Sequence, residues 1–342
     1  PDLDPKLASS VADVSGMYVT PGLVDIHTHS FRYFNSTVPD EYAIPNGVTT
    51  IVDAGGPGWK NFEKFKRLVV DKTDTRMFAL LNVAGPGMTK AAEQDITEMH
   101  AEPIAELIDV NRDLIIGVKT AHYDGPGWES VDTAVTAGTL SDTFVMVDFH
   151  QHPNRSYKEL LLKHMRPGDI HTHMYATSHL LNEDGQLQDY MTEARLRGIL
   201  FDVGHGAGSF RFRFAKPSMN QGFGPDTLST DAHKGSIFVK GATMPLVISK
   251  VVNMGMSLYE AVDRSTRVPA HVIGRPELGT LTIGSEADVA VFDLEEGEFG
   301  FVDSELARMN GNRRLRCHMT LRAGRVMWDL NGLTLHDWNT HQ

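Results

Sequence analysis

The chain has 342 residues, of which 41% are hydrophobic and 22% charged, and its formal net charge is −12 at pH 7. This length exceeds the usual single domain, although a barrel of alternating strands and helices commonly fills about 250 residues. Acidic residues spread along the chain argue against a nucleic-acid partner or an anionic membrane. The single cysteine, Cys317, excludes an internal disulfide framework and a thiolate cluster. Any metal must therefore be held by nitrogen and oxygen ligands.

The sequence contains no apolar stretch long enough to span a bilayer, and its opening residues, Pro1 to Ser10, are polar. We therefore expect no membrane partner and a cytoplasmic protein. The chain begins without an initiator methionine, so a secretion signal ahead of Pro1 would not be visible in this sequence.

The first predicted strand ends in a pair of histidines, in the segment Pro21-Gly22-Leu23-Val24-Asp25-Ile26-His27-Thr28-His29. Side chains at i and i+2 of a strand point to the same side, so His27 and His29 face one point. Two imidazoles that face one point indicate a metal site. A pair of surface histidines at a strand end is the alternative that this segment alone leaves open.

Seven further apolar runs follow, separated by longer amphipathic stretches, which is the pattern of βα units around a buried parallel sheet. Eight such strands predict a (β/α)8 barrel, the TIM barrel, whose chemistry lies at the C-terminal strand ends. The expected strands are 23–27, 48–53, 77–83, 114–119, 144–149, 169–173, 199–203 and 227–231, with helices at 61–70, 156–165, 184–197 and 245–254.

Candidate ligands lie at the ends of several of these strands or just beyond them. Because the C-terminal ends of parallel strands meet at one rim of a barrel, these side chains are expected to gather there. Glycine-rich segments 54–58 and 204–208 also follow strands, and we expect them to be turns. The candidates at the rim are Lys119, Asp148, His150, His171, His173, His205, Asp231 and His233.

The character of the chain changes after Gly274. Segments 279–284, 287–293 and 319–329 read as short strands joined by glycine turns, and residues 11–20 have a similar pattern. We expect residues 1–20 and 275–342 to form a small composite β-sandwich domain, and residues 21–274 to form the barrel. Ser257 followed by Glu260 predicts the start of a further helix.

Several motifs resemble those of the amidohydrolase superfamily, and most closely its dihydroorotase-like deacetylase branch. The resemblance covers nearly the whole chain and implies a binuclear metal centre, usually zinc, in a (β/α)8 barrel with a composite β domain. Family members usually carry strands before the position of Pro1, which implies that the start is absent, and a homo-oligomer is a family-level expectation. The motifs are segment 21–29, Gly117-Val118-Lys119, Gly168-Asp169-Ile170-His171-Thr172-His173, segment 225–233 with Ser229-Thr230-Asp231-Ala232-His233, Asn253-Met254-Gly255-Met256-Ser257-Leu258 and Gly284-Ser285-Glu286-Ala287-Asp288-Val289-Ala290-Val291.

The resemblance implies a role for each matching residue. His27 and His29 would bind the more buried metal together with Asp231. Lys119 would be carboxylated, and its carbamate would bridge two metals; burial that lowers its pKa would favour this reaction. A salt-bridged or exposed lysine is the alternative. His173 would bind the second metal, usually zinc, from strand six.

Strand five departs from the family pattern, because Asp148 stands where a histidine is usual. Asp148 and His150 point the same way, and either could be the ligand of the second metal. His171 is expected behind the ligands or at the rim. His205 and His233 could orient the substrate or support the ligands from behind.

The implied reaction is hydrolysis of an amide or ester bond of a small acylated molecule, as in a deacetylase. A hydroxide between two metals would attack, and Asp231 would move the proton as general acid/base. Cyclic amide hydrolysis of the dihydroorotase or hydantoinase type ranks below it, because Phe31, followed by Arg32, occupies the usual position of an arginine. A non-catalytic scaffold ranks last, since the ligand residues are retained.

Overall fold

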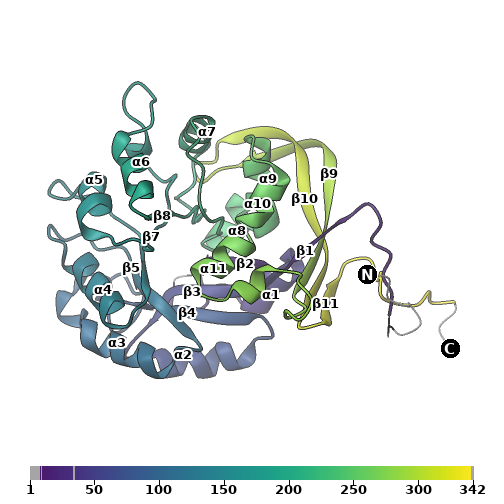
Figure 1. Cartoon of the computed structure of the whole chain (residues 1–342), viewed down its shortest axis with the longest axis horizontal. Coiled ribbons are helices and arrows are strands. Elements are labelled where there is room, and N and C mark those ends of the chain that lie inside the picture. Colours follow the sequence, from purple (N-terminus) through teal and green to yellow (C-terminus); the bar gives the residue numbers. More distant parts are fainter. Residues whose placement is uncertain (1–7, 9, 34, 340–342) are drawn as a thin grey trace.

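The computed structural model describes residues 8, 10–33 and 35–339, so part of the expected small domain, residues 1–7, 9 and 340–342, lies outside the described residues. Seven parallel strands form one sheet in sequence order, from β2 to β8. Figure 1 shows this sheet curling with helices on its outside. The strands are β2 (Leu23–Thr28), β3 (Val48–Gly58), β4 (Arg76–Asn82), β5 (Ile115–Thr120), β6 (Phe144–Val147), β7 (Ile170–His171) and β8 (Leu200–Phe201).

The eighth expected run, 227–231, is not a regular strand, yet it lies where an eighth strand would close the barrel. Thr227 forms a parallel bridge with Asp202, and Ala232 forms one with Thr28 of β2. Backbone hydrogen bonds continue along this segment, with His205 N–H donating to the Ser229 carbonyl over 3.2 Å. Asp231 interrupts the extended conformation with φ of 49°. The predicted barrel is therefore confirmed, with seven regular strands and one irregular segment.

The helices lie between the strands, as expected for βα units. The prediction for 61–70 is confirmed by α2, and that for 245–254 by α9. The expected helix at 156–165 consists of α5 and a π-helical turn, η6, whereas the expected helix at 184–197 is shorter. The helices are α1 (Pro39–Ala43), α2 (Phe62–Leu68), α3 (Ala101–Val110), α4 (Glu129–Leu140), α5 (Tyr157–Glu159), α6 (Asp189–Leu196), α7 (Phe212–Asn220), α8 (Lys234–Lys240), α9 (Met244–Asn253), α10 (Leu258–Asp263) and α11 (Arg267–Val272), with shorter turns η2 (Ile44–Asn46), η3 (Val70–Lys72), η4 (Ala92–Gln94), η5 (Ile96–Glu98), η6 (Leu160–His164), η7 (Ser178–Leu180) and η8 (Pro276–Gly279).

Caps explain two of these helix starts. Ser257 accepts a hydrogen bond from the backbone N–H of Glu260 at the start of α10, as the sequence predicts. Ser156 accepts one from Glu159 at the start of α5. Each cap satisfies a backbone donor that the first helical turn leaves unpaired.

Both chain ends contribute to a separate antiparallel sheet, with the order β1-β9-β10-β11. Its strands are β1 (Tyr18–Pro21), β9 (Val289–Val302), β10 (Arg308–Arg322) and β11 (Arg325–Asp329). Figure 1 shows this sheet at one side of the barrel. In the described residues the small domain consists of one sheet. The expected β-sandwich would have two layers of strands. We propose its division from the barrel at 20/21 and 274/275.

Two details of this sheet differ from the expectation. Segment 279–284 is not a strand but a turn region after η8. Conversely, β9 and β10 are 14 and 15 residues long, far beyond the expected apolar segments. Ion pairs across the two strands stabilise their polar parts, since Glu295 lies 2.7 Å from Arg314 and 3.1 Å from Arg316.

Two groups of buried apolar side chains line opposite faces of the barrel sheet. Leu23 and Ile51 pack with the helices outside, whereas Val24, Ile26 and Val52 belong to a second cluster. That cluster includes Ala270 and Ile273, at and just after α11, so this region closes one end of the barrel interior. Buried apolar area of this kind contributes about 25 cal/mol per Å² to folding.

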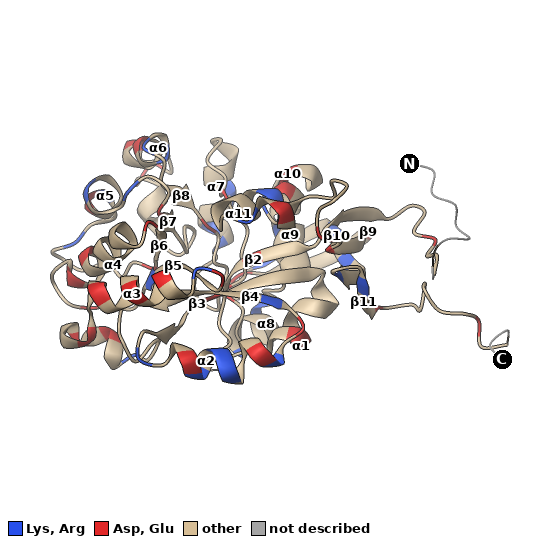
Figure 2. Ribbon diagram, turned by 60° about the horizontal axis from the view of Figure 1, so that its bottom comes forward, with Lys and Arg blue, Asp and Glu red and all other residues tan. Residues whose placement is uncertain are grey.

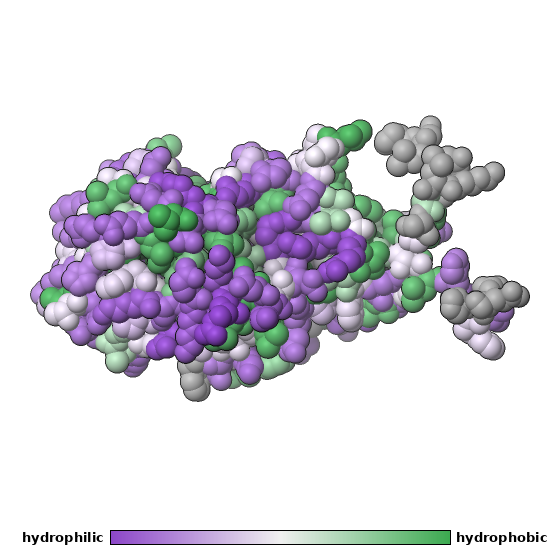
Figure 3. Space-filling view, turned by 90° about the horizontal axis from the view of Figure 1, so that it is seen from below, coloured by the Kyte–Doolittle hydropathy of each residue, from purple (hydrophilic) through white to green (hydrophobic). Residues whose placement is uncertain are grey.

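Charged side chains lie mainly on the outer helices, where α2 carries both signs (Figure 2). Hydrophobic side chains on the face seen from below are scattered among hydrophilic ones (Figure 3). Within the described part of the chain, no individual helix has the length and apolarity needed to cross a membrane. The neighbouring helices α8 and α9, which meet at an angle of 49°, satisfy those criteria only when taken together.

Candidate metal centre

Two irregularities in strand pairing turn the predicted ligands toward the barrel interior. Val24 and Ile26 face the interior, so a regular β2 would place His27 on the other face. The β2 register against β3 advances by one extra residue between Asp25 and Thr28, which is the mark of a β-bulge. His27 and His29 thereby share the interior face.

Lys119 reaches the interior in a similar way. The pairing of β4 with β5 shifts between Ala79 and Leu80, so that Leu80 pairs with Gly117. Lys119 then pairs with Met146, whose side chain belongs to the interior cluster. Paired residues of neighbouring strands share a face, and the long lysine side chain therefore lies inside the barrel, where it is 1% exposed.

Five side chains of the predicted ligand set converge at this point. His29 Nε2 lies 2.8 Å from Asp231 Oδ1, and His27 Nε2 lies 3.8 Å from the same oxygen. Lys119 Nζ is 3.2 Å from His27 Nε2. His173 completes the set, because His27, His173 and Asp231 each offer a ligand atom within 4.8 Å of the others. We call these five residues the inner cluster.

The inner cluster fits a divalent metal ion. Asp231 Oδ1 is buried and lacks a hydrogen bond of good geometry, so it is free to act as a ligand. Imidazole nitrogens and a carboxylate oxygen are ligands that zinc and other first-row metals accept. Burial, followed by the charge of Lys119, holds the pKa of His27 well below its usual value, and burial lowers the pKa of His29. Both imidazoles are therefore neutral, as metal ligands must be.

Polar groups behind the inner cluster fix its imidazole tautomers. His27 Nδ1 lies 2.9 Å from Thr172 Oγ1, and this hydroxyl donates to Asp202 over 2.8 Å. His27 Nδ1–H therefore donates to the threonine and leaves Nε2 with a free electron pair. His173 Nδ1–H donates to the Gly204 carbonyl over 2.6 Å, which likewise leaves Nε2 free.

Close backbone approach requires glycine at two places beside the cluster. A Cβ on Gly55, which has φ of +93°, would lie 2.7 Å from Lys119 Cγ. A Cβ on Gly206 would lie 2.4 Å from Asp231 Oδ2. The two glycine-rich segments are thus more than turns: segment 54–58 lies within β3, and both segments pack directly against candidate ligands.

Asp148 lies beside the inner cluster, where the strand-five ligand is expected. Its Oδ2 is 3.6 Å from His173 Nε2 and 3.7 Å from His122 Nε2. Burial raises the pKa of Asp148, but the neighbouring His173, His122 and Lys119 outweigh it and lower that pKa well below its usual value. His150 lies farther out, with a side chain that is 42% exposed and an Nδ1 that is 3.1 Å from Asp124. The geometry thus brings Asp148, rather than His150, against His173.

Two residues outside the set predicted from the sequence also lie here, His122 beside Asp148 and Glu93 beside His122. His122 Nδ1 lies 3.1 Å from Glu93 Oε2, and Glu93 is 1% exposed. Burial lowers the pKa of His122, but the hydrogen bond to Glu93 and the charge of Asp148 raise it to about 9. His122 follows Lys119 by three residues at a strand end, and this position could have predicted that His122 belongs to the site. Glu93 comes from η4, a connection that carries no such signal.

His171 and His233 do not join the inner cluster. His171 Nε2 lies 3.2 Å from His179 Nε2, and burial lowers the pKa of His171 to about 3. The side chain of His233 accepts a hydrogen bond from Gly235 N–H and caps α8. His171 still lines the cavity beside Asp148 and His173.

His205 is fully buried behind the rim, where it contacts an unexpected lysine. Its Nδ1 lies 2.9 Å from the Gly206 carbonyl, and its Nε2 lies 2.8 Å from Lys250 Nζ. Lys250 also donates to the Lys240 carbonyl over 2.8 Å. Burial lowers the pKa of Lys250 to about 7, although Asp303 opposes this shift.

We expect the Lys250→Met variant to lose part of the pH dependence of the protein's stability. In the unfolded chain the pKa of Lys250 returns to its usual value near 10.4, so between pH 7 and 10 the unfolded state binds more protons. The free energy of unfolding of the native protein should therefore increase as pH rises through that range. Lys250 should contribute up to roughly 1.4 kcal/mol per pH unit to this increase. Urea titrations of both proteins at several pH values measure the difference. If the free energy of unfolding changed equally with pH in the native protein and the variant, the expectation would be contradicted.

Two cavities open beside the inner cluster. One has a volume of about 340 Å³ and is lined by Asp148, His171 and His173 among others. The other, of about 460 Å³, is lined by residues that include Tyr33, Glu93 and His122. These volumes suit a small molecule.

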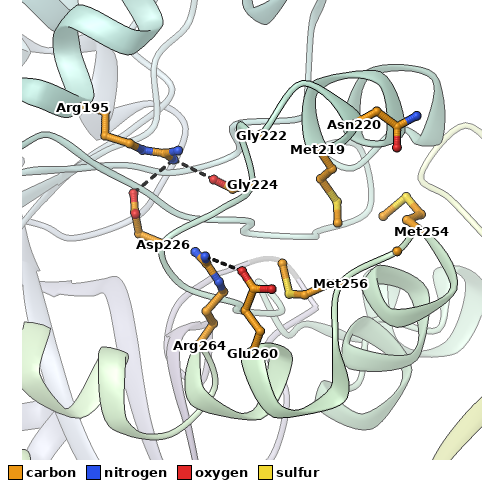
Figure 4. A pocket seen from close by; sticks show the side chains of 11 residues that line it. Arg195, Met219, Asn220, Gly222, Gly224, Asp226, Met254, Met256, Glu260 and Arg264 are labelled. Carbon is orange, nitrogen blue, oxygen red and sulfur yellow. Dashed lines mark hydrogen bonds and ion pairs between the residues drawn. The ribbon is translucent and has the colours of Figure 1, made fainter.

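A further cavity of about 410 Å³ lies elsewhere (Figure 4). It adjoins Asp226, which precedes the eighth barrel segment, whereas Asp231 lies at the opposite end of that segment. Figure 4 shows its charged side chains bound to one another. Arg195 lies 3.3 Å from Asp226, and Arg264 lies 2.7 Å from Glu260. This cavity therefore lies at the opposite end of the barrel from the inner cluster.

Fold and site together define a metal-dependent hydrolase built on a (β/α)8 barrel. A family model described as "Amidohydrolase family" matches residues 211–327. A protein named deacetylase from Agrobacterium fabrum is 30% identical over 305 residues, which cover 85% of this chain and 74% of the relative. A second deacetylase, from Brucella anthropi, is 29% identical over 313 residues, which cover 87% and 77%.

Solved structures agree with these relatives. The crystal structure of an adenine deaminase matches with a TM-score of 0.85 and 25% identity, covering 91% of this chain and 87% of that one. A dihydroorotase matches with a TM-score of 0.81 and 27% identity, covering 92% and 87%. The chain belongs to the amidohydrolase superfamily and is an enzyme that hydrolyses carbon–nitrogen bonds.

Proposed function

We propose that this enzyme is a zinc-dependent deacetylase or related acyl hydrolase that acts on a small acylated molecule. One observation carries the proposal: the ligand atoms of the inner cluster converge beside cavities of about 340 and 460 Å³. The relatives named deacetylase favour acyl amides over other substrates. A divalent ion bound in the cluster would lower the pKa of a water molecule and polarise the substrate carbonyl.

We propose distinct roles for the protein's own residues. His27, His29 and Asp231 would hold the inner metal. Asp148 and His173 would hold a second metal, with Asp148 in place of the usual histidine. Asp231 would take the proton from the attacking water and pass it to the leaving amine or alkoxide. Burial raises the pKa of Asp231, but His29 and His173 outweigh it and lower that pKa, so this carboxylate is ionised and able to accept a proton.

Lys119 would carry a carbamate. Burial lowers its pKa, although several carboxylates oppose this, and a neutral amine is the form that captures carbon dioxide. Its single hydrogen-bond partner among the described residues is His27. An ammonium group has three donors, so two would be left unpaired in a buried site. This shortage favours a neutral or carboxylated lysine over a salt-bridged one.

A paired measurement of metal content and substrate range tests the proposal. Elemental analysis of the purified protein should find at least two zinc-like ions per chain, and gentle mass spectrometry should find the mass of one carbon dioxide on Lys119. Acylated amino acids and simple esters should then release the free acid. Hydrolysis of dihydroorotate or hydantoins alone would favour the cyclic-amide alternative. A protein without metal under metal-replete conditions would favour the scaffold.

A further inference from the structure

A second group of potential ligands lies outside the inner cluster, at the rim of the barrel. His122, Asp148 and His150 each offer a ligand atom within 4.8 Å of the other two. His122 Nε2 lies 3.7 Å from Asp148 Oδ2, and the ring centroids of His122 and His150 are 5.5 Å apart. Neighbouring ligands of a tetrahedral zinc ion with bonds of about 2.0–2.1 Å are separated by about 3.3 Å. His122 and Asp148 are close to that spacing, and the partly exposed His150 can move inward.

Carboxylates on the far ring nitrogens prepare both histidines to act as ligands. His122 Nδ1 lies 3.1 Å from Glu93, and His150 Nδ1 lies 3.1 Å from Asp124. Glu93 is itself held by Asn82 Nδ2 over 3.0 Å. A carboxylate that accepts a hydrogen bond from Nδ1–H fixes the tautomer in which Nε2 carries a free electron pair. Such a carboxylate behind a histidine is the usual support of a metal ligand.

Charge and access also favour a cation at this place. Three carboxylates, Glu93, Asp124 and Asp148, surround two imidazoles. His150 and Asp124 line both cavities beside the inner cluster, so an ion can enter from either one. His122 is also held in the left-handed region, with φ of 57°, as are His173 and Asp231 of the inner cluster. Such conformations are concentrated at functional sites.

We propose that His122, Asp148 and His150 bind a first-row divalent cation such as Zn²⁺, at a rim site separate from the inner cluster. Two imidazoles and one carboxylate select Zn²⁺ or a similar metal over Mg²⁺ and Ca²⁺, which prefer oxygen ligands. Three protein ligands leave a coordination position for water or for an oxygen of the substrate. The rim site does not depend on the proposed hydrolysis, although its Asp148 is also the proposed ligand of the second metal. A proton on His122 Nε2 is the competing occupant.

Metal titration of the full-length protein tests this site. The protein is stripped with a chelator, and Zn²⁺ binding is followed by calorimetry, with Co²⁺ absorption spectra as a second readout. We expect His122→Asn and His150→Asn each to remove one equivalent of bound Zn²⁺ or to weaken that equivalent at least about 100-fold. Glu93→Gln should weaken it about 10- to 100-fold, as for other supporting groups. Excess Mg²⁺ should not compete.

His152→Asn is the matched control, because His152 follows His150 on the same loop and its Nδ1 accepts a hydrogen bond from Asn154 N–H. This variant should bind zinc as the native protein does. Native stoichiometry and affinity in both His122→Asn and His150→Asn would overturn the rim site, even if the protein hydrolyses acyl amides. The Asp231→Asn variant separates the two proposals: it should still bind the rim cation when hydrolysis is lost. Loss of the rim cation in that variant, with retention in His122→Asn, would overturn the inference.

Discussion

The Lys119→Ala variant should lose bound metal and nearly all hydrolytic activity. Lys119 is 1% exposed, and its Nζ lies 3.2 Å from His27 Nε2, at the centre of the inner cluster. Without the carbamate that we propose, the metals lose a shared ligand and their charge is poorly balanced. Metal assistance contributes several kcal/mol to such reactions, so kcat/KM should fall at least about 10³-fold. Elemental analysis and steady-state kinetics on an acylated substrate measure both effects.

A chemical rescue distinguishes a carbamate from a lysine that acts only by its charge. Formate or acetate can enter the space left by the alanine and supply the missing carboxylate, so part of the metal content and activity should return. Methylammonium should not restore either. The matched control is Lys163→Ala, whose lysine is 69% exposed and pairs only with Glu159 among the described residues. Rescue by the amine but not by the carboxylate would contradict the carbamate.

The Asp231→Asn variant should retain its fold and lose catalysis. Asparagine has nearly the same shape as aspartate and keeps one oxygen for the metal, but it cannot accept a proton. General acid–base groups contribute about 10²- to 10⁴-fold, so kcat should fall by that factor at equal metal content. KM should change little, because the substrate's binding contacts are retained. Steady-state kinetics, with metal content measured on the same samples, provide the values.

The control for this variant is Asp109→Asn, which changes an exposed carboxylate that pairs with Arg112 on the outer surface. It should leave kcat unchanged. If Asp231→Asn kept more than about a tenth of the native kcat at full metal content, Asp231 would not be the group that moves the proton.

Much of the fold could be predicted because its strands carry strong local signals. The apolar runs in β2 to β8 mark buried parallel strands, and each lies where expected within a few residues. The meeting of both chain ends in one small sheet could also be predicted, and it is seen in the pairing of β1 with β9. The length of β9 and β10 was not predictable, because Glu295, Arg314 and Arg316 make their middle parts polar. Only cross-strand pairing explains why those residues are in strands.

The ligand residues could be predicted, but their arrangement could not. His27, His29 and Lys119 lie at strand ends in recognisable motifs, and all three converge as predicted. Their orientation depends on β-bulges, which arise from pairing between strands and have no signature in one strand's sequence. Lys250 and Glu93 come from a helix and a connection, and only the tertiary fold brings them near His205 and His122. The strand-five substitution was visible, and the contact between Asp148 and His173 was not.

The pairing of β1 with β9 has a consequence for synthesis on the ribosome. Residues 18–21 form their sheet contacts with residues 289–292, so these four residues have no strand partner until most of the chain has been made. At about 5–20 residues per second, this interval lasts roughly 15 to 50 s. While the barrel is being made, Tyr18 and Val19 present an unpaired strand edge. Strand β1 thus waits for β9 during most of synthesis, and chaperone binding at β1 should end when β9 emerges.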